Sequence, residues 1–229
     1  MRASYQKDLI AQESYMLKGE SAHHLLNVVR IELNEELLLL NGLGLVVKAK
    51  VSSISKREIA LTMIQQNQVD RPFLMDLALG IPKKEALELS LKQAVELGFK
   101  KIYLIRAQYS QTRLPETERL ESLLISALEQ SNASYLPEII QATWEEVPIS
   151  DYSEILMLDS QNNSKDVKNV PSFATKLLIV GPEGGFSPEE CNYLHKIPRI
   201  RIVNLPTPIL RTPTAVATGA GIILGSLLD

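Results

Sequence analysis

Two loops near the C-terminus of this 229-residue sequence contain residue types that can hold a small molecule. The first spans residues 181–190 and contains three glycines, which let a ligand approach the backbone closely. It ends in Ser187-Pro188-Glu189-Glu190, which predicts a helix start with Ser187 as N-cap and Glu190 completing a capping box. Because the loop matches neither a P-loop nor the dinucleotide-binding glycine pattern, two interpretations stay open: a ligand-binding loop and a plain strand-to-helix turn.

The second loop, residues 206–215, also leads into a predicted helix, with Thr212 as N-cap and Pro213 in the first helical position. Arg211 is the only charged residue between positions 202 and 228. A cation kept in so apolar a segment usually has an anionic or hydrogen-bonding partner. Arg211 is therefore either half of a buried arginine–carboxylate pair or an anchor for a phosphate or an electron-rich base.

The elements that must position these loops follow from the pattern of the chain after residue 72. Short apolar runs alternate with helical periodicity, which predicts a parallel sheet with helices on both faces. The predicted strands are 74–80, 101–106, 154–158, 176–180 and 201–205, and the predicted helices are 83–97 and 116–131. Ligands of such sheets bind beyond the carboxyl ends of the strands. The two loops and a third, polar one at residues 159–164 should therefore meet at one edge.

The first 70 residues have a different, strand-rich pattern. Strands are predicted at 37–40, 45–51 and 58–64, with a hairpin signal at Asn41-Gly42 and a short helix at 22–30. The polar run Val69-Asp70-Arg71-Pro72 ends in proline and marks a boundary. The expected fold class is thus α/β, with a small barrel-like β domain at 1–70 and a parallel-sheet domain at 71–229.

Composition excludes several classes of protein and site. A single cysteine, Cys191, excludes a disulfide framework and a cysteine-clustered zinc site, and three histidines leave little for a histidine cage, so no metal is expected. The first residues lack the apolar core of a secretory signal. Residues 212–228 are uncharged but, at 17 residues, just short of a membrane span. We therefore expect a buried helix, no membrane association and a cytoplasmic protein; the small residues at 215–221 suit tight packing or a subunit interface.

The net charge of −3 argues, in bulk, against a nucleic-acid binder. The charge is uneven, however: residues 114–195 carry 14 acidic and four basic side chains, whereas residues 71–113 carry eight basic and four acidic. We therefore expect an RNA-facing surface with the acidic stretch turned away from it; the alternative is an ordinary solvated face. The basic residues expected there are Arg30, Lys83, Lys84, Arg106 and Arg113, joined by Lys100, Lys101, Arg199 and Arg201.

Several motifs resemble those of a known family. Gly181-Pro-Glu-Gly-Gly-Phe-Ser187 and Asn204-Leu-Pro-Thr-Pro-Ile-Leu-Arg-Thr-Pro-Thr-Ala215 resemble the cofactor-binding motifs of the SPOUT methyltransferases, in particular the RsmE-type family. His23-His24-Leu-Leu-Asn-Val-Val-Arg30 is similar to the N-terminal signature of that family, which lies in a PUA-like RNA-binding barrel. The sequence departs from the family pattern at Pro206, where glycine is usual, at Pro213, where glutamate is usual, and at 132–134, where an arginine is missing.

The resemblance implies a C-terminal domain with an α/β trefoil knot that binds S-adenosylmethionine and methylates N3 of a uridine in small-subunit (16S) ribosomal RNA. It implies as partners that RNA or the assembled small subunit, and a second copy of the chain in a homodimer. Arg211 would be catalytic, stabilising the developing uridine anion or holding a neighbouring phosphate. The implied cofactor-binding residues are Leu158, Asp159, Gly181, Pro182, Glu183, Gly184, Gly185, Leu205, Ile209, Leu210, Thr214 and Ala215.

The identity of a general base stays open at this point. Glu183 is the nearest candidate, although a role in bracing its loop is the stronger interpretation. Two other functions also stay open: a non-catalytic RNA-binding protein that retains the SPOUT fold, and an α/β enzyme acting on a different nucleotide-like molecule.

Overall fold

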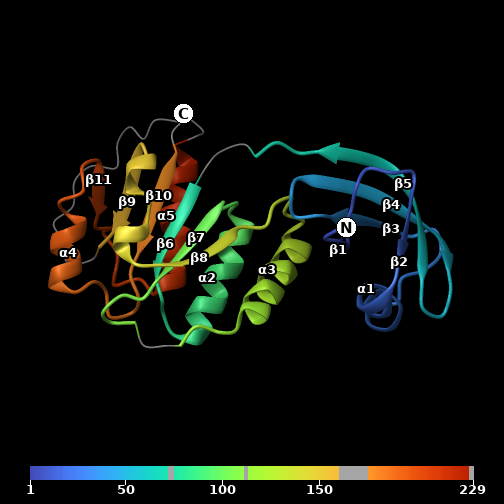
Figure 1. Cartoon of the computed structure of the whole chain (residues 1–229), viewed down its shortest axis with the longest axis horizontal. Helices are drawn as coiled ribbons and strands as arrows, with labels where there is room; N and C mark the ends of the chain where they lie inside the picture. Colours follow the sequence, from blue (N-terminus) through green and yellow to red (C-terminus); the bar gives the residue numbers. More distant parts are fainter. Residues whose placement is uncertain (72–74, 111–112, 160–174, 227–229) are drawn as a thin grey trace. The chain divides into compact units, whose positions relative to one another are not determined.

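The computed structural model describes residues 1–71, 75–110, 113–159 and 175–226 (Figure 1). The chain forms two compact units, one comprising Met1–Arg71 with Ile125–Leu136 and the other Pro72–Leu124 with Pro137–Asp229. Each unit is built on its own sheet, one of five strands and one of six. The expected polar loop at 159–164 lies, apart from Asp159, outside the described residues.

The first unit contains a five-stranded, mostly antiparallel sheet in the order β1-β3-β4-β5-β2. The strands predicted at 37–40, 45–51 and 58–64 are confirmed as β3 (Glu36–Leu40), β4 (Leu45–Ile54) and β5 (Ile59–Gln68). The short edge strands β1 (Ala3–Tyr5) and β2 (Ser14–Leu17) were not predicted. The helix expected at 22–30 is α1 (Gly19–His24) followed by a π-helical turn, η1 (Leu25–Val29).

The predicted hairpin joins β3 to β4 through a loop that Asn41 organises. Its side-chain oxygen accepts hydrogen bonds from the backbone N–H groups of Leu43 (2.8 Å) and Leu45 (3.0 Å). Gly42 and Gly44 take φ angles of 70° and 97°, which non-glycine residues rarely adopt. The Asn-Gly signal therefore locates the turn correctly.

The end of helix α3 (Thr117–Ser131) and the turn after it complete this first unit. The backbone N–H of Gly44 donates to Ser134 O (2.9 Å), and the backbone N–H of Tyr5 donates to Glu129 Oε1 (2.7 Å). A single boundary near residue 70 therefore does not describe where residues 125–136 pack. Helical periodicity predicts α3 but does not show which unit its end packs against. The expected boundary near residue 70 therefore differs from the observed packing.

The second unit contains six parallel strands in the order β11-β9-β10-β6-β7-β8. All five predicted strands are confirmed, as β6 (Met75–Gly80), β7 (Lys101–Ile105), β9 (Glu154–Leu158), β10 (Lys176–Val180) and β11 (Ile200–Val203). The edge strand β8 (Glu138–Ala142) was not predicted, because its residues are half-buried or exposed and give no apolar run. The predicted helices are α2 (Lys84–Glu96) and α3.

Helices cover both faces of this sheet, as predicted. Ile155, Met157 and Leu177 belong to a core that also contains Trp144 and Leu194, the last residue of α4 (Pro188–Leu194). The opposite face is covered by α2 and by α5 (Thr212–Gly225), which pack against each other (Figure 1). None of the helices in the described parts of the chain is long and apolar enough to cross a membrane.

Helix α5 lies close to the sheet at Gly219. A Cβ atom there would lie 2.5 Å from Leu178 Cδ1 and 3.2 Å from Leu158 Cδ1, whereas one at Gly221 would have no atom within 4 Å. We expect Gly219→Ala to lower the free energy of unfolding by about 1–3 kcal/mol through overpacking. Gly221→Ala should raise it by up to about 1 kcal/mol through helix propensity. Urea denaturation of the two variants measures this difference, and equal changes would contradict the close packing.

Candidate functional site

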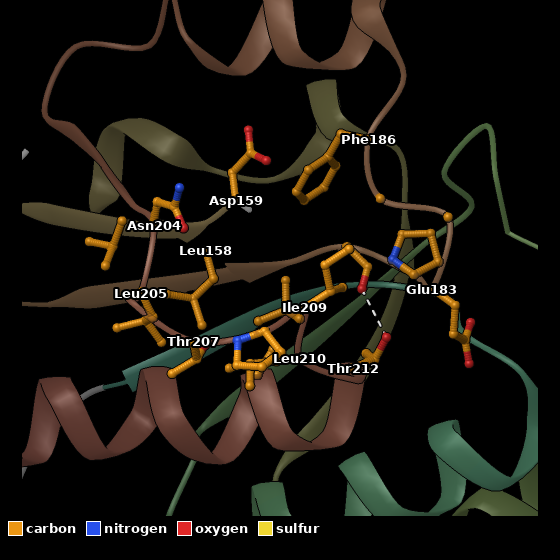
Figure 2. A pocket seen from close by; sticks show the side chains of 18 of the residues that line it. Leu158, Asp159, Glu183, Phe186, Asn204, Leu205, Thr207, Ile209, Leu210 and Thr212 are labelled. Carbon is orange, nitrogen blue, oxygen red and sulfur yellow. Dashed lines mark hydrogen bonds between the residues drawn. The ribbon is translucent and has the colours of Figure 1, made fainter. Parts of the chain in front are cut away.

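A pocket opens at the carboxyl ends of β9, β10 and β11 (Figure 2). The empty space within it, open solvent at its mouth included, amounts to about 910 Å³. Because these strands run parallel, the loops that follow them meet at one edge, as the sequence pattern predicts. Its lining consists of Leu158, Asp159, Val180, Gly181, Pro182, Glu183, Gly184, Gly185, Phe186, Cys191, Val203, Asn204, Leu205, Thr207, Pro208, Ile209, Leu210, Thr212 and Ala215.

The glycine-containing loop after β10 forms one wall of this pocket. Gly185 has a φ of 71°, and a Cβ atom there would meet nothing within 4 Å, so this part of the backbone faces open space. Gly184 packs against Tyr109, whose Cβ would lie 2.7 Å from a Cβ at that position. The loop is therefore supported on one side by Tyr109 and accessible at Gly185.

The predicted capping box at the start of α4 is confirmed. Ser187 Oγ accepts a hydrogen bond from the backbone N–H of Glu190 (3.1 Å), and Glu190 Oε2 accepts one from the backbone N–H of Ser187 (2.8 Å). Glu190 Oε1 additionally accepts from Gln108 N (3.1 Å) and Trp144 Nε1 (3.0 Å). Glu190 thus holds together three segments that are far apart in sequence.

Another wall is the loop before α5, and a hydrogen bond joins it to the glycine loop. Thr212 Oγ1 donates to the carbonyl oxygen of Gly181 at 3.2 Å, as the dashed line in Figure 2 shows. The prediction that Thr212 caps α5 is wrong: Arg211 is the N-cap, and Thr212 begins the helix. The Thr212 hydroxyl is engaged by Gly181 instead of the helix. Pro213 is buried in the first turn, where a missing N–H costs nothing.

The pocket brings together most of the residues expected to bind a cofactor. Only Thr214, exposed in the first turn of α5, does not line it. The side chains of Phe186, Cys191 and Asn204 also line the pocket and were not predicted. Phe186 and Asn204 adjoin predicted residues of the two loops, which was the available signal, whereas no local pattern points to Cys191.

Arg211 does not line the pocket but lies next to Leu210 and Thr212, which do. Its residue is exposed, and among the described residues no carboxylate forms an ion pair with it. The interpretation of Arg211 as half of a buried arginine–carboxylate pair is therefore wrong. Its guanidinium lies at the surface, where an anionic ligand can reach it.

Glu183 braces its loop, which was the stronger of the two interpretations of this residue from sequence. Both of its carboxylate oxygens lie 3.2 Å from the backbone nitrogen of Lys83, which donates to them. Figure 2 shows the carboxylate turned away from Leu205, Ile209 and Leu210. The structure therefore gives Glu183 a positioning contact in place of a base aimed into the pocket.

Part of the expected basic surface lies at the same edge of the sheet as the pocket. Exposed Lys83 and Lys84 follow β6, and exposed Arg106 follows β7. Exposed Arg113 lies farther along the segment between β7 and α3. Arg30, also exposed, belongs to the other unit and has a left-handed φ of 56°.

The expected basic residues do not all share one edge of the sheet. Lys100, Lys101, Arg199 and Arg201 lie at or near the amino ends of β7 and β11, at the opposite edge of the sheet. Arg201 there pairs with Glu154 at 3.2 Å. Two residues of the acidic stretch, Asp159 and Glu183, line the pocket. Counting charge along the chain cannot separate the two ends of a strand, so it could not assign these residues to an edge.

Comparisons with known proteins agree with this architecture. Residues 69–224 match the family model described as an RNA methyltransferase domain, and residues 17–64 match an RNA methyltransferase PUA domain. The chain is 30% identical over 208 residues to the ribosomal RNA small subunit methyltransferase E of Rickettsia conorii, covering 86% of this chain and 83% of that protein.

Solved structures give the same result. A protein of Legionella pneumophila, solved with the cofactor SAM, has a TM-score of 0.83 at 25% identity, with 98% of this chain and 97% of that chain covered. The ribosomal RNA small subunit methyltransferase E of Neisseria gonorrhoeae has a TM-score of 0.86 at 23% identity, with the same coverage, and supports the fold. Fold and family matches together define an RNA methyltransferase with an N-terminal PUA domain. Within that class, the chain belongs to the ribosomal RNA small subunit methyltransferase E family.

Proposed function

We propose that this protein transfers the methyl group of S-adenosylmethionine to N3 of a uridine in 16S ribosomal RNA. The observation that carries the proposal is the pocket in which residues 181–187 and 204–215 meet and are joined by the bond from Thr212 to Gly181. Both segments carry the motifs that resemble those of methyltransferases, and the similar Legionella pneumophila protein was solved with SAM.

The residues of the pocket suit this cofactor. Leu158, Leu205, Ile209 and Leu210 provide apolar walls for an adenine ring, and the open space at Gly185 lets a ligand approach the backbone closely. The carboxylate of Asp159 adds a negative charge that suits a cationic ligand. When bound, S-adenosylmethionine supplies an electrophilic methyl group on a sulfonium, so the chain mainly has to hold donor and acceptor in line.

We assign the role of anion stabiliser to Arg211. Uridine N3 must lose its proton before it can attack a methyl group, and negative charge then develops on the base. The exposed guanidinium of Arg211, which has no carboxylate partner among the described residues, can stabilise that charge or hold an adjacent phosphate. If the target base is stacked or paired, it must first leave its helix.

The proposed substrate is 16S ribosomal RNA or the assembled small subunit, met by the basic residues at the pocket edge and by Arg30. We also propose that the C-terminal segment forms a trefoil knot, that two copies form a homodimer, and that the protein acts in the cytoplasm. The boundaries proposed for the RNA-binding and catalytic domains are 1–70 and 71–229 along the chain, although residues 125–136 pack within the first unit.

The deciding experiment incubates the protein with unmodified small subunits and methyl-labelled S-adenosylmethionine, followed by nucleoside analysis. Label in 3-methyluridine is the expected result. Label in another nucleoside would overturn the proposed specificity. Calorimetry with the cofactor alone provides the second measurement: no binding at millimolar concentration would instead favour an RNA-binding protein without catalytic activity.

RNA binding through the basic edge should depend strongly on salt. Replacing Lys83 and Lys84 together by alanine removes two cations, and we expect weaker binding to small-subunit RNA and a salt slope shallower by about 1–2. Fluorescence anisotropy over a range of salt concentrations measures both. The matched control replaces Lys100 and Lys101, which lie at the opposite edge of the sheet. An equal effect in both double variants would rule out an RNA contact specific to the pocket edge.

A further inference from the structure

We propose that Asp159, Cys191 and His195 form a binding site for a zinc-class divalent cation at one end of the pocket. Each side chain offers one ligand atom, and these three atoms all lie within 4.8 Å of one another. Carboxylate oxygen, thiolate sulfur and imidazole nitrogen are the three ligand types that zinc accepts in proteins.

The fold supplies these ligands from two elements. Cys191 and His195 are four residues apart, and the backbone N–H of His195 donates to Cys191 O at 2.8 Å, so helical geometry places both side chains on one face of α4. Asp159 follows the carboxyl end of β9. A cation bound by all three would therefore tie the end of the sheet to the helix that follows the glycine loop.

The surroundings of the three ligands are acidic, since Glu190 adjoins Cys191 in α4. A divalent cation would offset that negative charge and would bind Cys191 as the thiolate. Asp159 and Cys191 both line the pocket, so the site lies at the pocket wall.

The composition of the chain argues against cysteine-clustered and histidine-cage sites, but it does not address a mixed set. One cysteine, one histidine and one aspartate, with the first two spaced i and i+4, suffice for a three-ligand site with an open position. This site shares Asp159 and one wall of the pocket with the proposed cofactor site, but the methyl-transfer chemistry proposed above needs no metal.

Cobalt(II) is the probe of choice, because a cobalt–thiolate bond gives a charge-transfer absorption band in the near ultraviolet. Cys191 is the only cysteine in the sequence, so such a band can arise from no other residue. We expect the intact protein, without cofactor or RNA, to show the band on titration with cobalt(II) and Cys191→Ser to lack it. Zinc should displace cobalt, and magnesium should not.

His195→Ala should weaken cobalt binding at least about 10-fold. His195 is exposed, so this variant is expected to fold even if Cys191→Ser does not. His24→Ala, which removes an exposed histidine in the other unit, is the matched control and should leave the affinity unchanged. Absence of the thiolate band, or equal affinity in wild type and His195→Ala, would overturn the site. Either result leaves the methyltransferase proposal unaffected, since no step of it involves the cation.

Discussion

Arg211→Ala is expected to lower the rate of methyl transfer at least about 100-fold, the range found when a donor that stabilises a developing anion is removed. Arg211 is exposed and does not line the pocket, so the affinity for S-adenosylmethionine should change little. Single-turnover methylation of small subunits, together with calorimetry on the cofactor, separates the two quantities. Far-UV circular dichroism checks that the variant retains the helix content of the wild type.

Arg211→Lys is the informative companion to this variant. It keeps the positive charge but removes the planar guanidinium, so it should still attract a phosphate but no longer donate two parallel hydrogen bonds to it. An alanine variant that turns over at nearly the wild-type rate would exclude the role assigned to Arg211. Reduced cofactor affinity with an unchanged chemical step would assign it to cofactor binding instead.

The second large effect is expected at Glu190. Glu190→Ala removes the acceptor for Ser187 N, Gln108 N and Trp144 Nε1, and leaves partly buried donors without it. We expect the free energy of unfolding to fall by about 2–4 kcal/mol, the sum of several modest hydrogen bonds. Because the indole of Trp144 packs edge-on against Phe186 at 5.8 Å between ring centroids, the pocket wall should loosen as well.

Glu189→Ala provides the matched control. Glu189 is the neighbouring exposed acid in the first turn of the same helix, so its replacement tests the helix-dipole contribution alone. Urea denaturation and cofactor calorimetry on both variants give the comparison. If Glu189→Ala lowers stability as much as Glu190→Ala, the loss comes from helix electrostatics, and Glu190 does not organise the pocket wall.

Local sequence patterns predict much of the second unit. Apolar runs locate β9 and β10 at their observed bounds, and Ser187-Pro188-Glu189-Glu190 predicts the start of α4 correctly. These features succeed because the interactions involved are between residues close in sequence. The same patterns place the two loops at one edge of a parallel sheet, which is sufficient to predict most of the pocket lining.

Features that depend on distant partners could not be predicted. The bonds from Gln108 and Trp144 to Glu190 span 82 and 46 residues, and no local pattern signals either. Thr212 has the residue type of an N-cap, but a carbonyl 31 residues away engages its hydroxyl. For Arg211, a buried pair and an exposed cation agree equally well with its apolar neighbours, and only the structure distinguishes them.

The discontinuous first unit has a consequence for biosynthesis. The strand β5, the last in its sequence, ends at Gln68. Two later residues nevertheless form hydrogen bonds with the β3–β4 loop: Ser134 O accepts from Gly44 N, and Leu136 N donates to Gly42 O. At a translation rate of about 5–20 residues per second, the first unit must wait roughly 3–14 seconds before these partners are synthesised. The N-terminal unit therefore cannot complete its native contacts on the ribosome until residues 72–124, the first part of the catalytic unit, have also been made.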